Sequence, residues 1–99
     1  MNLKLKDKIV VITGGTGGIG KYIALDFLLE EAVVVLLYRN EKKLETLQKW
    51  LSQQVETDGR LFAYNTSITD TKAIAEVVKK IIAAHSQIDV LVNLSLIHI

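Results

Sequence analysis

The chain contains no cysteine and no proline, and neither sign of charge predominates among its 99 residues. Without cysteine, disulfide bonds and thiolate metal sites are excluded, and no metal site is expected; this composition fits the reducing cytosol. Lysine and arginine number 12, aspartate and glutamate 11, and the net charge is +1. Such a balance gives no electrostatic reason to expect a nucleic acid or an anionic membrane as a partner.

Long apolar runs are also lacking, because no stretch approaches the roughly 20 residues of a membrane span. Lys4, Lys6 and Lys8 precede the apolar run of residues 9–12, as in a signal peptide, but that run is too short and ends at glycines. The chain is long enough for one domain at most, and its 49% hydrophobic content is ordinary for a globular protein. We therefore expect a soluble, cytoplasmic protein.

Short β-branched runs alternate with longer segments of helical period along the chain. The runs predict strands at residues 8–13, 33–38, 61–65 and 88–93. The predicted helices cover residues 18–30, the segment from Asn40 to the Asp58-Gly59 turn, and the segment after Asp70. Asn40 and Asp70 are residue types that cap helix N-termini. The connection at residues 30–32 lacks the glycine that often ends a helix.

Three of the four predicted strands, the first, second and fourth, are apolar at nearly every position. Strands of this kind are buried on both faces, as in a parallel sheet that helices cover on each side. The sequence therefore predicts an α/β fold of order β-α-β-α-β-α-β, with a doubly wound parallel sheet in the strand order 3-2-1-4.

Five of the six glycines lie between Gly14 and Gly20, directly after the first strand and at the start of the first helix. A helix N-terminus attracts anions through its unpaired N–H groups and its dipole. Glycines let the backbone turn sharply and let a phosphate approach closely. In this setting the loop predicts a pyrophosphate site. A glycine-rich turn without a ligand is the other interpretation, and we disfavour it because so many glycines weaken folding.

Three glycine patterns fit the loop: G-x-G-x-x-G from Gly15, and both T-G-x-x-G-x-x-G and T-G-x-x-x-G-x-G from Thr13. The last pattern occurs with Tyr38-Arg39-Asn40, with residues 66–70, and with the segment Ile-Asp-Val-Leu-Val-Asn at residues 88–93. In these motifs the chain resembles the shorter branch of the short-chain dehydrogenase/reductase family, from about residue 7 to residue 93. The last motif favours the T-G-x-x-x-G-x-G register.

The resemblance implies a Rossmann-type fold and the cofactor-binding half of an oxidoreductase. Such enzymes transfer hydride between a nicotinamide cofactor and a carbonyl or alcohol substrate. The residues it assigns to cofactor binding are Gly14, Thr16, Gly18, Ile19, Gly20, Arg39, Ser67 and Asn93. The family usually has aspartate where this chain has Ser67, so the adenine contact there rests on one hydroxyl. Full-length relatives are commonly homo-oligomers, either dimers or tetramers.

The end of the second predicted strand indicates which nucleotide is preferred. An acid there would bind the 2′-hydroxyl of NAD, but this chain has Tyr38. Arg39 follows and is placed to pair with a 2′-phosphate, so we expect NADP(H) to be favoured over NAD(H). A solvated surface arginine is the alternative interpretation. Glu41 is near, but it belongs to the helix start, where an acid suits the dipole.

No catalytic residue is assigned to this chain. Tyr38 and Lys42 spell the Y-x-x-x-K pattern of the family, in which the lysine lowers the pKa of the tyrosine. We interpret the match as a coincidence, because the family's pair lies on a later helix, beyond a fifth strand. The 99 residues alone are therefore expected to be inactive. His85 is expected to face the helix dipole or solvent, Trp50 and Tyr64 to pack, and the Lys42-Lys43 pair to be solvated.

After Asn93 the family pattern continues with Asn-Ala-Gly, whereas this chain continues with Leu-Ser-Leu-Ile-His-Ile. The codons CTG TCT CTT ATA CAC ATC encode that hexapeptide and resemble a transposon-end sequencing adapter. We therefore expect residues 1–93 to be the front part of a dinucleotide-binding domain and residues 94–99 to be a non-native tail. Two alternatives remain: a cofactor-sensing module of the same fold without chemistry, and a methyltransferase, against which Tyr38 argues.

Overall fold

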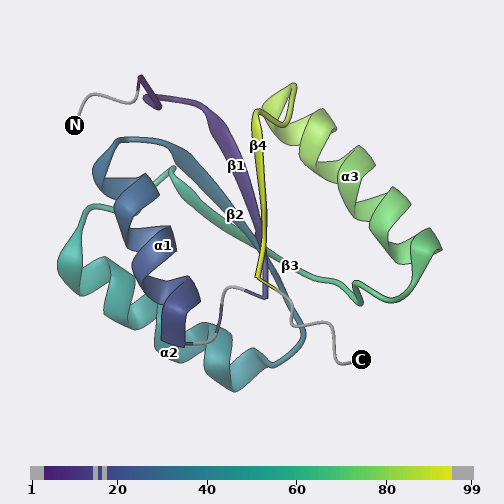
Figure 1. The fold of residues 1–99 in the computed structure, drawn as a ribbon, viewed down its shortest axis with the longest axis horizontal. Coiled ribbons are helices and arrows are strands. Elements are labelled where there is room, and N and C mark those ends of the chain that lie inside the picture. The colour runs from purple at the N-terminus through teal and green to yellow at the C-terminus, as the bar shows by residue number, and fades with distance from the viewer. Residues whose placement is uncertain (1–3, 15, 17, 95–99) are drawn as a thin grey trace.

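The computed structural model describes residues 4–14, 16 and 18–94, and the strands and helices in them alternate along the chain (Figure 1). The elements are β1 (Ile9–Thr13), α1 (Gly18–Leu29), β2 (Val33–Tyr38), α2 (Glu41–Gln54), β3 (Leu61–Asn65), α3 (Thr71–His85) and β4 (Val90–Asn93). The predicted order of strands and helices is confirmed, and the predicted strand bounds agree to within two residues.

The four strands form one parallel sheet in the order β3-β2-β1-β4, as predicted. Helices α1 and α2 cover one face of this sheet and α3 covers the other (Figure 1). This is the doubly wound, Rossmann-type arrangement, in which the carboxyl ends of all strands meet at one edge. Strand β1 lies in the interior of the sheet because β2 and β4 pair with its two sides.

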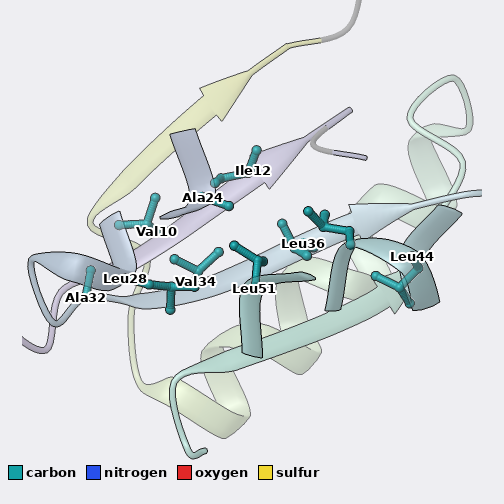
Figure 2. Packing of buried hydrophobic residues seen from close by; sticks show 10 residues of the cluster. Val10, Ile12, Ala24, Leu28, Ala32, Val34, Leu36, Leu44 and Leu51 are labelled. Atoms are coloured by element: carbon teal, nitrogen blue, oxygen red, sulfur yellow. The ribbon is translucent and has the colours of Figure 1, made fainter. Parts of the chain in front are cut away.

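Alternation along β1 and β2 explains why both strands are apolar at every position before their last residues, Thr13 and Tyr38. Val10 and Ile12 of β1 point to the face under α1 and α2, where Leu28 and Leu51 also pack (Figure 2). The intervening residues of the same strands join Val77 and Ile81 of α3 in a second, smaller cluster on the opposite face. A strand buried on both sides must be apolar throughout.

Side-chain caps start α2 and α3, as the sequence predicts. Oδ1 of Asn40 accepts a hydrogen bond of 3.0 Å from the N–H of Lys43. Oδ1 of Asp70 accepts bonds from the N–H groups of Lys72 and Ala73, at 3.0 and 3.2 Å. These caps satisfy N–H groups that have no partner within their helices.

The turn from α1 to β2 closes without glycine because Glu31 adopts the left-handed conformation, with φ at 63°. Its N–H donates to the carbonyl of Leu28, and the N–H of Ala32 donates to the carbonyl of Phe27. This pair of bonds is the Schellman arrangement that ends many helices. The carbonyl of Glu31 also accepts from the guanidinium of Arg60, so the turn is tied to the start of β3.

Asp89 fixes the position of β4 against β1. Its Oδ2 accepts a hydrogen bond of 2.8 Å from the N–H of Ile9, and its own N–H donates to the carbonyl of Ile9. Oδ1 accepts from the side chain of Gln87, also at 2.8 Å. The bond from Ile9, helped by Gln87 and by nearby Lys8, lowers the pKa of Asp89 below its ordinary value.

Candidate cofactor-binding site

The carboxyl ends of β1 and β4 meet where the sheet changes its winding direction. Helix α1 leaves β1 toward one face, and α3 precedes β4 on the other (Figure 1). Parallel sheets of this kind bind ligands in the crevice at such a switch point. The residues that end these strands, and the glycine loop after β1, are therefore the candidate site.

Thr13 and Asn93 close this edge of the sheet. They are paired in register, and the Thr13 hydroxyl donates a hydrogen bond of 3.0 Å to Oδ1 of Asn93. The N–H of Leu94 donates to the carbonyl of Thr13 at 3.0 Å, so the parallel pairing continues one residue beyond β4. Residues 95–99, where most of the expected non-native tail falls, lie outside the described residues. Asn93 is thus held beside the glycine loop, as a cofactor contact requires.

The described part of the glycine loop has the features of a phosphate cradle. Gly14 has a φ of 70°, which a side chain would strain, and it turns the chain out of β1. Gly18 is the first residue of α1, and a Cβ built on it would meet no atom of the described residues within 4 Å, apart from its chain neighbours and the backbone of its own helix. Ile19 is 74% exposed and Gly20 is buried. The space at Gly18 is thus open among the described residues, at the end of α1 where N–H groups have no partner within the helix.

Tyr38 ends β2, and its side chain is engaged by the first turn of α2. Its hydroxyl donates a hydrogen bond of 3.0 Å to Oε1 of Glu41. Partial burial and this bond raise the pKa of Tyr38 above its ordinary value of 10.0. A proton-relay tyrosine needs the opposite shift, so the geometry favours a chance Y-x-x-x-K match with Lys42. Arg39 is exposed beside this pair.

Ser67 follows β3 at the same edge of the sheet. The N–H of the buried Thr66 donates to the carbonyl of Tyr38 at 2.9 Å, which holds this segment against the end of β2. The hydroxyls of Ser67 and Thr69 lie 3.0 Å apart and share a hydrogen bond. Ser67 is therefore placed near the end of β2, with one hydroxyl already partnered.

The family model described as short chain dehydrogenase matches residues 8–95, which is most of the chain. The chain belongs to the short chain dehydrogenase family. A 3-oxoacyl-[acyl-carrier-protein] reductase from Thermotoga maritima is 35% identical over 91 residues, covering 92% of this chain and 36% of that protein. An uncharacterized oxidoreductase from Bacillus subtilis, YvrD, is 36% identical over 93 residues, covering 94% of this chain and 34% of that protein. This family member thus spans about a third of the length of these relatives.

Solved structures of other family members have the same fold. A short chain dehydrogenase from Bacillus anthracis superposes with a TM-score of 0.83 at 31% identity, covering 92% of this chain and 35% of that one. L-sorbose reductase from Gluconobacter frateurii, solved with NADPH and L-sorbose, gives 0.82 at 27% identity, covering 98% and 36%. The predicted family and fold are therefore confirmed. These relatives are named as reductases, dehydrogenases or oxidoreductases, so the sensing module considered from the sequence is not favoured.

One histidine of this short chain dehydrogenase is more enclosed than the sequence suggests. His85 lies in the last turn of α3, where the helix dipole favours it, but it is only half-exposed: its ring packs edge-on against Phe62, with centroids 4.6 Å apart, and its Nε2 is buried with no hydrogen-bond partner among the described residues. No cluster of metal-binding side chains occurs in the part of the chain that the structure describes. Within the same residues, no helix has the length and apolarity needed to cross a bilayer.

A pocket beside the glycine loop was missed from the sequence. It has a volume of about 540 Å³ and lies between the start of α1 and one side of α2. The described residues that line it are Thr16, Gly18, Lys21, Lys42, Lys43, Thr46, Leu47 and Trp50. Trp50 packs, as expected, but it also forms one wall of this pocket. These side chains come together because of how α1 and α2 are rotated against each other, and no sequence motif predicts that rotation.

Proposed function

We propose that this chain is the dinucleotide-binding part of an NADP(H)-dependent oxidoreductase acting on a carbonyl or alcohol substrate. The observation that carries the proposal is the open space at Gly18, at the N-terminus of α1 and beside the positive-φ turn at Gly14. A pyrophosphate fits such a place, because helix N–H groups and the dipole favour an anion and no Cβ obstructs it. The nicotinamide would supply the hydride chemistry.

The preference for NADP(H) is proposed from the end of β2. The residue that would be an acid in an NAD-binding protein is Tyr38, and its hydroxyl is engaged with Glu41. Arg39 is exposed and forms no ion pair with another described residue, so its guanidinium is available to a phosphate. L-sorbose reductase, whose fold this chain shares, was solved with NADPH. That observation supports the proposal by similarity.

The test is a fluorescence titration of the 99-residue chain with NADPH and with NADH. We expect NADPH to bind at least about tenfold more tightly, which is the size of one charge-assisted hydrogen-bonded contact. Equal binding, or tighter binding of NADH, would contradict the cofactor preference. Binding of neither nucleotide would contradict the assignment of the glycine loop.

We also propose that the chain binds its cofactor without catalysing a reaction, and that a longer parent protein, dimeric or tetrameric, does so. Among residues 1–93 the only Y-x-x-x-K match is Tyr38 with Lys42, and Tyr38 is bonded to Glu41. The assay is NADPH consumption in the presence of a panel of ketones. Turnover above the rate in buffer would contradict this proposal, and it would leave the binding proposal intact.

A further inference from the structure

The turn between α2 and β3 contains an aspartate that is followed by glycine. Of the five aspartates in the chain, at positions 7, 26, 58, 70 and 89, only Asp58 has such a neighbour, which is Gly59. The backbone nitrogen after an aspartate is able to attack its side-chain carboxyl group, and a Cβ on the attacking residue hinders that approach. Glycine has no Cβ, so the attack is least hindered at Asp58.

The hydrogen bonds of this turn leave the attacking nitrogen free. The carbonyl of Thr57 accepts a bond of 3.0 Å from the N–H of Arg60. The N–H of Asp58 donates to Oε1 of Glu56, also at 3.0 Å. The N–H of Gly59 donates to no acceptor among the residues that the structure describes. No hydrogen bond to a described residue therefore has to break before this nitrogen reacts.

The carboxylate of Asp58 is equally free. Its side chain is exposed and bonds to none of the described residues, whereas the carboxylates of Asp70 and Asp89 accept bonds from backbone N–H groups. Asp58 and Gly59 also line an open groove of about 590 Å³, which Lys49 of α2 borders. Water therefore reaches both reacting groups, and no described contact fixes the carboxylate.

We propose that Asp58 is a site of spontaneous isomerisation, at which aspartate becomes isoaspartate through a cyclic imide. The nitrogen of Gly59 forms a bond to Cγ of Asp58, and the carboxyl hydroxyl leaves with the N–H proton as water. A second water then opens the ring. Cleavage at the α-carbonyl carbon leaves the chain running through Cγ, which is isoaspartate, and cleavage at Cγ restores aspartate. One water is released and one is consumed, so no oxidant or cofactor takes part.

Isoaspartate would lengthen the backbone by one carbon just before β3. The next residue after Gly59 is Arg60, whose carbonyl accepts a bond of 2.8 Å from the N–H of Val34. Its guanidinium donates to Oδ1 of Asp7 at 3.2 Å and to the carbonyl of Glu31. These bonds tie the start of β3, an edge strand of the described sheet, to the segments before β1 and β2. The added carbon displaces Arg60 from these partners and loosens β3.

The test is incubation of the folded chain in water labelled with heavy oxygen, followed by proteolysis and mass spectrometry. Each passage through the imide places one heavy oxygen at the aspartate that reacts. An isoaspartyl methyltransferase with S-adenosylmethionine then measures the product, because it methylates isoaspartate and leaves aspartate unaltered. We expect both signals at Asp58 and neither at the other four aspartates.

The matched control is Asp58→Glu, which keeps the charge but has to close a larger ring, so it should form no isomer. Asp58→Asn is the opposite control, since its amide cyclises faster with release of ammonia; freshly prepared protein still carries the asparagine. The unaltered chain unfolded in urea gives the rate without the turn. We expect the folded chain to react within about tenfold of that rate, because exposed turns open at little free-energy cost.

A melting curve of the isoaspartyl form, separated by chromatography, measures the effect on β3. We expect its melting temperature to be lower by about 4–8 °C, the shift for loss of one ordinary hydrogen bond in a domain of this size. Heavy oxygen spread evenly over the five aspartates would overturn the proposal, as would a folded chain that is protected far beyond the expected range. An unchanged melting temperature would overturn the role of this turn in anchoring β3.

Discussion

The hydroxyl of Thr13 donates a hydrogen bond of 3.0 Å to the side-chain oxygen of Asn93, across 80 residues of chain. Thr13 is buried at the end of β1, and Asn93 ends β4. The bond joins the two strands at the edge where the candidate site lies. The bond therefore connects the stability of this edge with the candidate site, because Asn93 is among the residues expected to contact the cofactor.

Substitution of Thr13 by valine keeps the shape of the side chain and removes the donor. We expect Thr13→Val to lower the free energy of unfolding by about 1 kcal/mol, the usual net contribution of one hydrogen bond. Urea denaturation followed by circular dichroism measures it. The control is Thr46→Val, where the hydroxyl lost is exposed on α2 and bonded only to its own helix. Equal stability of Thr13→Val and the unaltered chain would contradict the prediction.

A substitution at Gly18 should lower the affinity for the cofactor without lowering the stability of the fold. Because a Cβ at this position meets no other described residue within 4 Å beyond its own helix and chain neighbours, Gly18→Ala is expected to leave the fold intact. Alanine also favours a helix over glycine, so the melting temperature should be unchanged or slightly raised. The added methyl would occupy the space proposed for the pyrophosphate, and affinity for NADPH should fall by about tenfold or more. Unchanged affinity in a well-folded variant would exclude a phosphate from this position.

Asp89 makes the free energy of unfolding depend on pH. Its pKa is lowered in the folded chain, so the unfolded chain binds its proton first as the pH falls. The stabilisation is complete above the ordinary value of 3.8 and is lost as the pH falls through the lower folded value. Asp89→Asn should therefore be less stable than the unaltered chain at neutral pH, and the difference should shrink below about pH 3.8.

Denaturation curves at several pH values test this dependence on Asp89. Asp58→Asn is the matched control, because Asp58 lies in an exposed turn and its carboxylate bonds to none of the residues that the structure describes. A difference between Asp89→Asn and the unaltered chain that persists at the lowest pH would show that the charge on Asp89 is not responsible.

Glu31 adopts a conformation that glycine tolerates better. With φ at 63°, its Cβ is strained, and the cost of this conformation for a non-glycine residue is about 1–2 kcal/mol. Glu31→Gly should raise the free energy of unfolding by up to about 1 kcal/mol, since the added entropy of the unfolded chain offsets part of the gain. Glu30→Gly, one residue earlier and without positive φ, should destabilise instead. Equal effects of the two substitutions would contradict this explanation.

The sequence predicted those parts of the fold that depend on local signals. Asn40 and Asp70 cap helices as expected, because a cap involves only the next three residues. The apolar strands predicted a doubly covered parallel sheet, because burial on both faces demands them. The position of the glycine loop between a strand and a helix is confirmed, because it follows from the order of the elements, whereas its anion site stays a prediction.

Contacts between distant elements were not predictable in the same way. The cluster of Lys21, Tyr22 and Trp50 depends on how α1 and α2 are rotated against each other, and residue spacing does not record that rotation. The left-handed Glu31 was missed because glycine is the usual signal for that conformation. The N–H of Ile9 donates to the carboxylate of Asp89, 80 residues further along the chain. This bond was not predictable, because a backbone N–H is present at nearly every residue and does not mark its partner in the sequence.

The strand order has a consequence for how the chain folds. Only α1 separates β1 from β2, and only α2 separates β2 from β3, whereas β1 meets β4 after every other element has been made. Pairing β1 with β4 closes a loop that contains all the elements between them, and closing such a long loop is entropically costly and slow. We therefore expect a three-stranded intermediate during synthesis, in which one edge of β1 is uncovered and open to pairing with a strand of another molecule. The hydrogen bond from Thr13 to Asn93 would then form only after the other strands have paired.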